Sequence, residues 1–175
     1  MKQSFSRGFT LVELLIVIAI LAVLATVILP KLNSARDLAL EAKARSEIGE
    51  VVSAMALLYD DTGEYSNGAG SYCRSSVPSD NEVDLSSDDA GLLANGTSLP
   101  GWDGPYLQSA VDPWGTPYYL DEDYQCMAST TGCQGIIDTG NDSSVVVSCG
   151  PNKAVGTDSC EYDADNIVYR LCDTS

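Results

Sequence analysis

The chain has 175 residues, of which 25 are acidic and 9 basic, and its formal net charge is −16. A surface this acidic repels phosphate backbones, so we do not expect the chain to bind nucleic acid directly. It contains no histidine. This removes the commonest general base, the usual zinc ligand and every Ser-His or Cys-His nucleophile pair, so we do not expect an enzyme.

A long apolar run, residues 9–29, carries a single charge at Glu13. A helix of this length spans roughly 30 Å, the thickness of the hydrocarbon core of a bilayer. The eight residues before it include Lys2 and Arg7, a short basic leader expected to stay in the cytoplasm. An ordinary secretory signal loses its apolar stretch on cleavage. A cut after Gly8 would instead keep this stretch on the mature chain.

The segment Gly8-Phe9-Thr10-Leu11-Val12-Glu13 resembles the type III signal of type IV pilins and type II secretion pseudopilins. The resemblance implies that a prepilin peptidase cuts after Gly8 and methylates the new amino terminus at Phe9. It also places Pro30 where many family members have a helix-kinking proline. The implied partners are other copies of the chain, packed through their N-terminal helices, an inner-membrane assembly platform and minor pilins or pseudopilins.

Glu13 is costly in this setting, because a carboxylate inside an apolar membrane helix costs roughly 2.5–3.5 kcal/mol on insertion scales. One interpretation is a capping box, with Thr10 as N-cap and Glu13 three residues later. The family resemblance implies a second role, in which Glu13 pairs with the freed amino group of Phe9 on a neighbouring subunit. The two interpretations are compatible.

Residues 31–63 change to an amphipathic pattern that predicts a continuation of the same helix. Apolar side chains recur at three- and four-residue steps from Ile48 to Tyr59, and we expect this stripe to bury against a C-terminal sheet. Asp60 to Gly63 is the predicted stop, with Gly63 as a left-handed cap. Pro30 lacks a donor N–H and is expected to bend or locally melt the helix.

Residues 64–175 predict a loop-rich head with a small antiparallel sheet, so the expected fold class is α+β and pilin-like. A short helix is predicted near residues 88–95. Strands are predicted at 117–120, possibly extended to 124, and at 145–148 and 167–171. The stretches around Trp102 and Trp114 resemble the W-x-G-P-Y and D-P-W-G-x-P-Y signature of the major pseudopilin of type II secretion. Both tryptophans are expected to pack at the helix–sheet junction.

Six cysteines lie in this head and none forms C-x-x-C, which favours disulfides formed outside the cytoplasm. Fifteen pairings are possible. Chain proximity favours Cys126 with Cys133 and Cys149 with Cys160, leaving Cys73 for Cys172. Buried free thiols are the alternative.

The resemblance to the major pseudopilin also implies a calcium-binding loop, with candidate ligands Asp158, Asp163, Asp165 and Asn166. The loop departs from the family at Asn152, where an aspartate is usual, and a Cys149–Cys160 bridge could close it in place of the metal. An acidic surface loop without metal is the alternative.

The sequence therefore predicts four segments: a leader (1–8), a membrane-spanning and filament-core helix (9–30), its amphipathic continuation (31–63) and a disulfide-containing head (64–175). The predicted function is a structural subunit of a type IV filament, with its head outside the cytoplasmic membrane, in a secretion pseudopilus. The alternatives are a surface pilus for adhesion, motility or DNA uptake, and a solitary membrane-anchored binding module.

Overall fold

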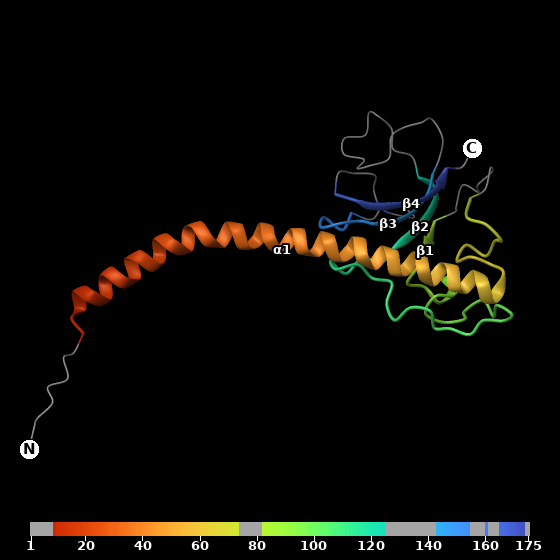
Figure 1. The fold of residues 1–175 in the computed structure, drawn as a ribbon, viewed down its shortest axis with the longest axis horizontal. Helices are drawn as coiled ribbons and strands as arrows, with labels where there is room; N and C mark the ends of the chain where they lie inside the picture. The colour runs from red at the N-terminus through yellow and green to blue at the C-terminus, as the bar shows by residue number, and fades with distance from the viewer. Residues whose placement is uncertain (1–8, 74–81, 125–142, 155–159, 161–164, 174–175) are drawn as a thin grey trace, which may run out of the picture. The chain divides into compact units, whose positions relative to one another are not determined.

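The computed structural model describes residues 9–73, 82–124, 143–154, 160 and 165–173. Its elements are a long helix, four strands and a 3₁₀ turn, in an α+β arrangement that confirms the predicted class (Figure 1). In chain order they are α1 (Leu11–Thr62), β1 (Val83–Asp84), η1 (Asp88–Ala90), β2 (Tyr119–Tyr124), β3 (Ser143–Ser148) and β4 (Ile167–Asp173).

The contacts within the chain divide it into two compact units, one ending at Ala39 and the other beginning at Leu40. The first unit contains the apolar part of α1. This helix is long and apolar enough to cross a membrane, with a mean hydropathy of 3.1 in its most apolar window, none of which is buried. Pro30 was predicted to bend or locally melt the helix; the helix is continuous through this position, so it does not melt there, and the bend stays a prediction.

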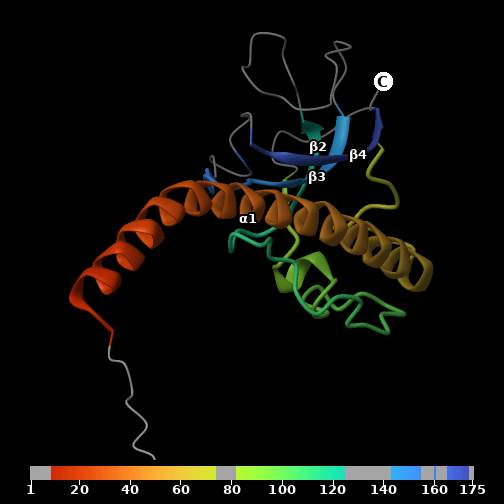
Figure 2. The same cartoon turned by 60° about the vertical axis from the view of Figure 1, so that its left-hand side comes forward.

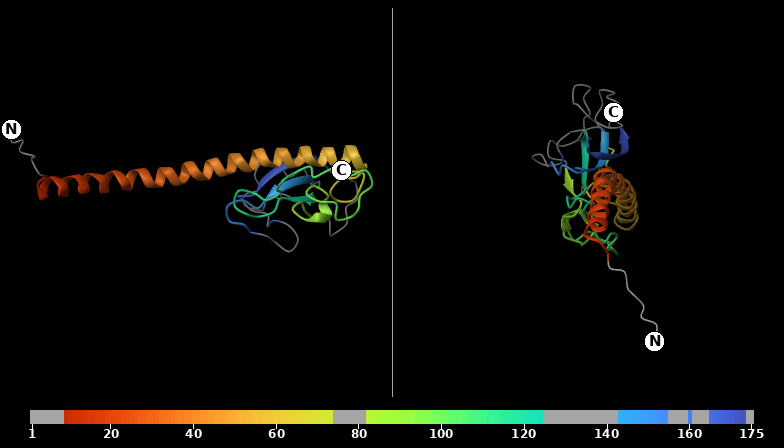
Figure 3. Two further views of the ribbon diagram at one scale, coloured as in Figure 1. Left: turned by 90° about the horizontal axis from the view of Figure 1, so that it is seen from below. Right: turned by 90° about the vertical axis from the view of Figure 1, so that its left-hand side faces the viewer.

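The second unit contains a four-stranded antiparallel sheet in the order β1-β2-β3-β4. Leu120 of β2 lies opposite Val146 of β3, which lies opposite Tyr169 of β4. Register shifts interrupt both the β2–β3 and the β3–β4 pairings. The right-hand panel of Figure 3 shows the strands to one side of the C-terminal part of α1.

The core of the second unit forms on the face of the sheet that meets α1. The helix contributes its predicted apolar stripe except for Tyr59, which is 40% exposed, and the sheet contributes Leu120, Val146 and Ile167. The segment between β1 and β2 adds Leu85 and Leu92 to the same core, and Figures 1 and 2 show the sheet above the ribbon of α1 and this segment below it. The buried helical residues are Ala44, Ile48, Val51, Ala54, Met55 and Leu58. Burial of this stripe is the main force holding helix and sheet together.

The end of α1 is fixed by two separate contacts. Gly63 adopts a left-handed conformation, φ +76°, and its N–H donates to the Tyr59 carbonyl at 2.8 Å, which is the predicted cap. The Tyr106 hydroxyl donates to Asp61 Oδ2 at 2.7 Å. Gly101 is needed here, because a Cβ at this position would lie 2.5 Å from the Asp61 carbonyl oxygen.

Both tryptophans are partly buried against the main core, as predicted. Trp102 donates its indole N–H to the Gly91 carbonyl at 2.7 Å, and its ring lies edge-on to Tyr106 with centroids 5.8 Å apart. An indole that is half-buried needs a partner for its one donor, and the Gly91 carbonyl supplies it. The W-x-G-P-Y segment therefore attaches the β1–β2 connection to the end of α1.

Several predicted boundaries differ from the structure. β1 was not predicted, because two residues are too short to show strand periodicity. The predicted helix near residues 88–95 is only the 3₁₀ turn η1, which Ser87 caps and Gly91 ends in a left-handed conformation. The strand predicted to begin at residue 117 begins at Tyr119, and the other two strands are longer than predicted.

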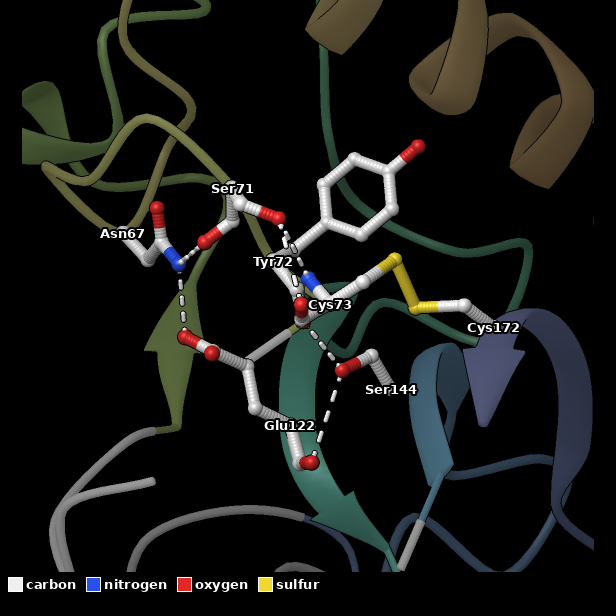
Figure 4. Close-up of a disulfide and its surroundings, with 7 residues drawn as sticks. All are labelled: Asn67, Ser71, Tyr72, Cys73, Glu122, Ser144 and Cys172. Carbon is white, nitrogen blue, oxygen red and sulfur yellow. Dashed lines mark hydrogen bonds between the residues drawn. A yellow bond between two sulfur atoms is a disulfide. The ribbon is translucent and has the colours of Figure 1, made fainter. Parts of the chain in front are cut away.

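Two disulfides lie among the described residues, and both match the predicted pairing: Cys149–Cys160 was favoured by chain proximity and Cys73–Cys172 was the pair left over. Cys73–Cys172 joins Cα atoms 6.0 Å apart and Cys149–Cys160 joins Cα atoms 5.0 Å apart. The predicted Cys126–Cys133 pair lies outside the described residues. Beside Cys73, Ser144 donates to the Tyr72 carbonyl, and Asn67 Nδ2 donates to Glu122 Oε1 at 2.6 Å (Figure 4). The segment after α1 is thus fastened covalently to β4 and by hydrogen bonds to β2 and β3.

Candidate functional site

The start of α1 carries the residues predicted for maturation and assembly. Gly8 lies outside the described residues, and Phe9 is the first residue described, with 84% of its surface exposed. Thr10 N–H donates to Glu13 Oε2 at 2.8 Å, and Glu13 N–H donates to Thr10 Oγ1 at 3.2 Å. This reciprocal pair is the predicted capping box.

The Glu13 carboxylate is fixed beside Phe9 by these bonds. The Thr10 hydroxyl also donates to Glu13 Oε2, at 2.7 Å. None of the three bonds uses Oε1, so among the described residues this oxygen still has lone pairs for a further donor. The capping role and the proposed pairing with an amino group therefore use different atoms of one side chain, so both can operate together.

The first unit exposes apolar side chains from Phe9 to Ile28. Their exposed fractions range from 49% at Val17 to 84% at Phe9. Soluble proteins rarely expose apolar patches of this extent, and such patches mark contacts with membranes or other chains. This surface must therefore be covered by lipid or by other protein. The exposed residues include Leu11, Val12, Leu14, Leu15, Ile16, Ile18, Ile20, Leu21, Val23, Leu24, Val27 and Ile28.

Asp112 connects the D-P-W-G turn to the sheet, a role that the sequence analysis missed. Its Oδ1 accepts from the backbone N–H groups of Trp114 at 3.0 Å and Thr116 at 2.9 Å, and its Oδ2 accepts from Ser148 Oγ at 2.6 Å. Ser148 Oγ in turn accepts from the Gly150 N–H at 3.2 Å. An aspartate preceding a proline is a turn signal that could have identified the local bonds, although not the one to Ser148.

Of the four predicted calcium ligands, the structure describes Asp165 and Asn166. Asn152 donates to both oxygens of the Asp165 carboxylate, from its backbone N–H at 2.9 Å and from Nδ2 at 2.7 Å. Gly150 lies against the same residue, since a Cβ at this position would be 2.1 Å from the Asp165 carbonyl oxygen. In this described part of the loop, the Asp165 carboxylate is held by amide donors. Asp158 and Asp163 lie outside the described residues, so the ligand set stays a prediction.

A different group of carboxylates converges at the β1–β2 edge of the sheet. Glu82, Asp121 and Asp123 each place one oxygen within 4.8 Å of the others. Asp121 is fully buried. Burial and the nearby negative charges of Asp123 and Glu82 raise the pKa of Asp121 to about 7, although the Asp123 N–H, which donates to Asp121 Oδ1 at 3.1 Å, opposes the shift. The three carboxylates could hold a cation. The raised pKa of Asp121 also makes the stability of the protein depend on pH.

We expect Asp121→Asn to stabilise the protein above pH 7. The unfolded carboxyl loses its proton near pH 4, whereas the folded one keeps it to about pH 7. Between these values the folded state binds more protons, so wild-type stability falls as the pH rises. The variant should lack this slope and exceed the wild type at pH 8 by about 2–4 kcal/mol. Denaturant titrations from pH 4.5 to 8 measure this, with exposed Asp60→Asn as the control. Parallel curves for wild type and Asp121→Asn would contradict it.

Comparisons with known proteins show what this chain is similar to. The family model for the prokaryotic N-terminal methylation motif matches residues 4–29. The type IV wide pilus major component PilA4 of Thermus thermophilus is 39% identical over 62 residues, 35% of this chain and 47% of that protein. The chain thus spans about half the length of that relative. No solved structure matches.

Two further relatives are similar over a longer stretch that includes much of the head. Type II secretion system core protein G of Pseudomonas aeruginosa is 29% identical over 119 residues, 67% of this chain and 75% of that protein. The protein of the same name from Pectobacterium carotovorum is 32% identical over 115 residues, 65% of either chain. The predicted resemblance is therefore confirmed: the chain carries the prokaryotic N-terminal methylation motif and is similar in sequence to type IV pilin and type II secretion pseudopilin subunits.

Proposed function

We propose that this chain is a pseudopilin-like structural subunit of a type IV filament and has no catalytic role. The observation that carries the proposal is the start of α1, where a fixed carboxylate, Glu13, stands in an otherwise apolar and exposed run that coincides with the methylation motif. An anchor alone needs no such acid. A subunit that polymerises through this helix needs the acid as the partner of an amino group on another copy.

In the proposed mechanism, α1 exchanges lipid for the α1 helices of other copies. Lipid tails and neighbouring helices are equally apolar, so the hydrophobic effect does not favour one over the other. Van der Waals packing and polar contacts between the helices therefore determine whether they associate. The amino group freed at Phe9 of a neighbouring copy would be the positively charged partner of the Glu13 carboxylate. Each charge then offsets part of the other's desolvation cost inside the bundle.

The head favours a secretion pseudopilus over a surface pilus. The two core protein G relatives align over much of the chain, whereas the similarity to the pilus component covers 35% of it. We propose that the single apolar segment crosses the cytoplasmic membrane, that the head stays outside the cytoplasm, and that an assembly platform with minor pseudopilins completes the machinery. A surface pilus remains the alternative, which the neighbouring genes would distinguish.

Gly8→Glu is expected to block removal of the leader. The residue before the proposed cut is a glycine, which has no side chain. A carboxylate at this position should therefore keep the chain out of the peptidase site. Intact-mass measurement of the membrane-extracted protein should show a wild-type chain that begins at a methylated Phe9, and a variant that keeps residues 1–8. Ser4→Glu, with the same charge change away from the cut, should mature normally. A Gly8→Glu chain that still begins at Phe9 would reject this cleavage site.

Calcium binding by the loop that contains Asp158, Asp163, Asp165 and Asn166 is a separate proposal. Its support is the number of oxygen ligands in the loop and the resemblance of the two tryptophan motifs to the major pseudopilin signature. If calcium binds, the melting temperature of the mature chain should rise with calcium and return on chelation, and Asp163→Asn should reduce the rise. A melting temperature insensitive to calcium would exclude the site, without affecting the filament role.

A further inference from the structure

A surface cavity of about 510 Å³ lies in the second unit. It opens between the segment that follows α1 and the segment that follows η1. A volume of this size is typical of sites for small organic groups. Its lining residues are Glu64, Tyr65, Ser66, Asn67, Gly68, Val83, Asp89, Thr97, Ser98, Leu99 and Pro100.

Four polar side chains of the cavity carry oxygen atoms that no described residue uses. The side chains of Glu64, Asp89, Thr97 and Ser98 form no hydrogen bond or ion pair with any described residue. The lining residues include two carboxylates and no lysine or arginine.

Ser66 gives an independent indication of a missing ligand. It lines the cavity and is only 5% exposed, and its hydroxyl has no hydrogen-bond partner. A buried hydroxyl without a partner is destabilising, so native proteins rarely keep one unless a water or ligand satisfies it. A ligand that satisfies this hydroxyl would remove the cost.

The geometry points to a site for an ammonium or guanidinium group carried on a short apolar stem. The two carboxylates would accept from the cationic head through charge-assisted hydrogen bonds. Val83, Leu99 and Pro100 offer apolar surface on which the stem can lie. Such a group is presented by a lysine or arginine side chain of a polypeptide and also by a free polyamine.

The test uses the full mature chain in detergent, with binding followed by isothermal titration calorimetry. N-acetyl-arginine methylamide represents a polypeptide side chain and putrescine represents a free polyamine. Binding of the first alone identifies a polypeptide source, and binding of putrescine alone identifies a polyamine source. The neutral isostere N-acetyl-citrulline methylamide should bind at least about tenfold more weakly than the arginine probe, because it lacks the charge. Equal binding of the two isosteres, or no binding of either cation, would overturn the proposal.

Matched variants separate the cavity from the general acidity of the head. Glu64→Gln with Asp89→Asn should weaken binding about tenfold or more. Glu50→Gln with Asp60→Asn removes the same charge outside the cavity and should change binding less than twofold. Equal losses in the two double variants would mean diffuse attraction and would reject the site.

Two further substitutions keep the proposal testable if the carboxylate variant folds poorly. Thr97 is an exposed lining residue, so Thr97→Arg should fold and should occupy the site with its own guanidinium, abolishing binding. Ser66→Ala should weaken binding while leaving the free protein as stable as the wild type or more so, because it removes an unsatisfied hydroxyl. Undiminished binding by Thr97→Arg would place the probe elsewhere.

Discussion

Glu13→Val is expected to leave membrane insertion intact and to abolish filament assembly. Valine removes a charge that costs roughly 2.5–3.5 kcal/mol on insertion scales, so insertion should improve. Loss of the bonds to Thr10 should cost the helix start about 1 kcal/mol, too little to unfold a helix anchored in lipid. The amino group of Phe9 on a neighbouring copy would then lack its partner. Membrane fractionation measures insertion, and electron microscopy measures fibre formation.

Glu13→Gln is the matched control that separates the two roles of this side chain. Glutamine preserves the capping box, since its amide oxygen can accept from Thr10, but it carries no charge. If charge pairing drives assembly, Glu13→Gln should fail almost as completely as Glu13→Val. If capping alone matters, it should form normal fibres, and the pairing role would be wrong.

Removing the Cys73–Cys172 bridge should produce the largest loss of stability in the head. The bridge joins residues separated by 99 positions, and the chain-entropy model assigns a loop of this size about 4.7 kcal/mol. It also holds Tyr72 beside Ser144, whose hydroxyl donates to the Tyr72 carbonyl. Cys73→Ala with Cys172→Ala should therefore lower the free energy of unfolding by about 4–5 kcal/mol, measured by denaturant titration of the mature chain.

The Cys149–Cys160 bridge provides the comparison within the same molecule. Its separation of 11 positions predicts a smaller loss, about 3 kcal/mol. The corresponding double alanine variant should thus unfold at a higher denaturant concentration than the Cys73 and Cys172 variant. The reverse order would show that loop closure is not the main contribution of these bridges.

The parts of the fold that were predictable are those that a local pattern specifies. Period 3.6 from Ile48 to Tyr59 predicts the buried face of α1, and Gly63 predicts its cap. The capping box at Thr10 and Glu13 is likewise a four-residue signal. These features depend on neighbours in the sequence, so the sequence alone contains the necessary information.

The features that escaped prediction depend on residues far apart in the chain. Tyr118 is an example: it is buried, and its hydroxyl donates to Glu47 of α1 at 2.9 Å. Burial and the Glu47 carboxylate raise the pKa of Tyr118 well above its usual range, so it stays a donor. The bond from Asn67 to Glu122 and the one from Ser148 to Asp112 are of the same kind. No local pattern identifies such partners.

The attachment of Tyr106 and Gly101 to the last turn of α1 limits how chains of this type can diverge. An added residue shortly before Asp61 would rotate its side chain by about 100° around the helix axis, away from the Tyr106 hydroxyl, and would move a new carbonyl toward Gly101. Descendants of such a chain can therefore exchange side chains freely on the outer surface of this turn. An insertion or deletion in this part of the helix would need a simultaneous change in the loop that carries Gly101 and Tyr106. Because two changes are needed together, such changes in helix length should be rare.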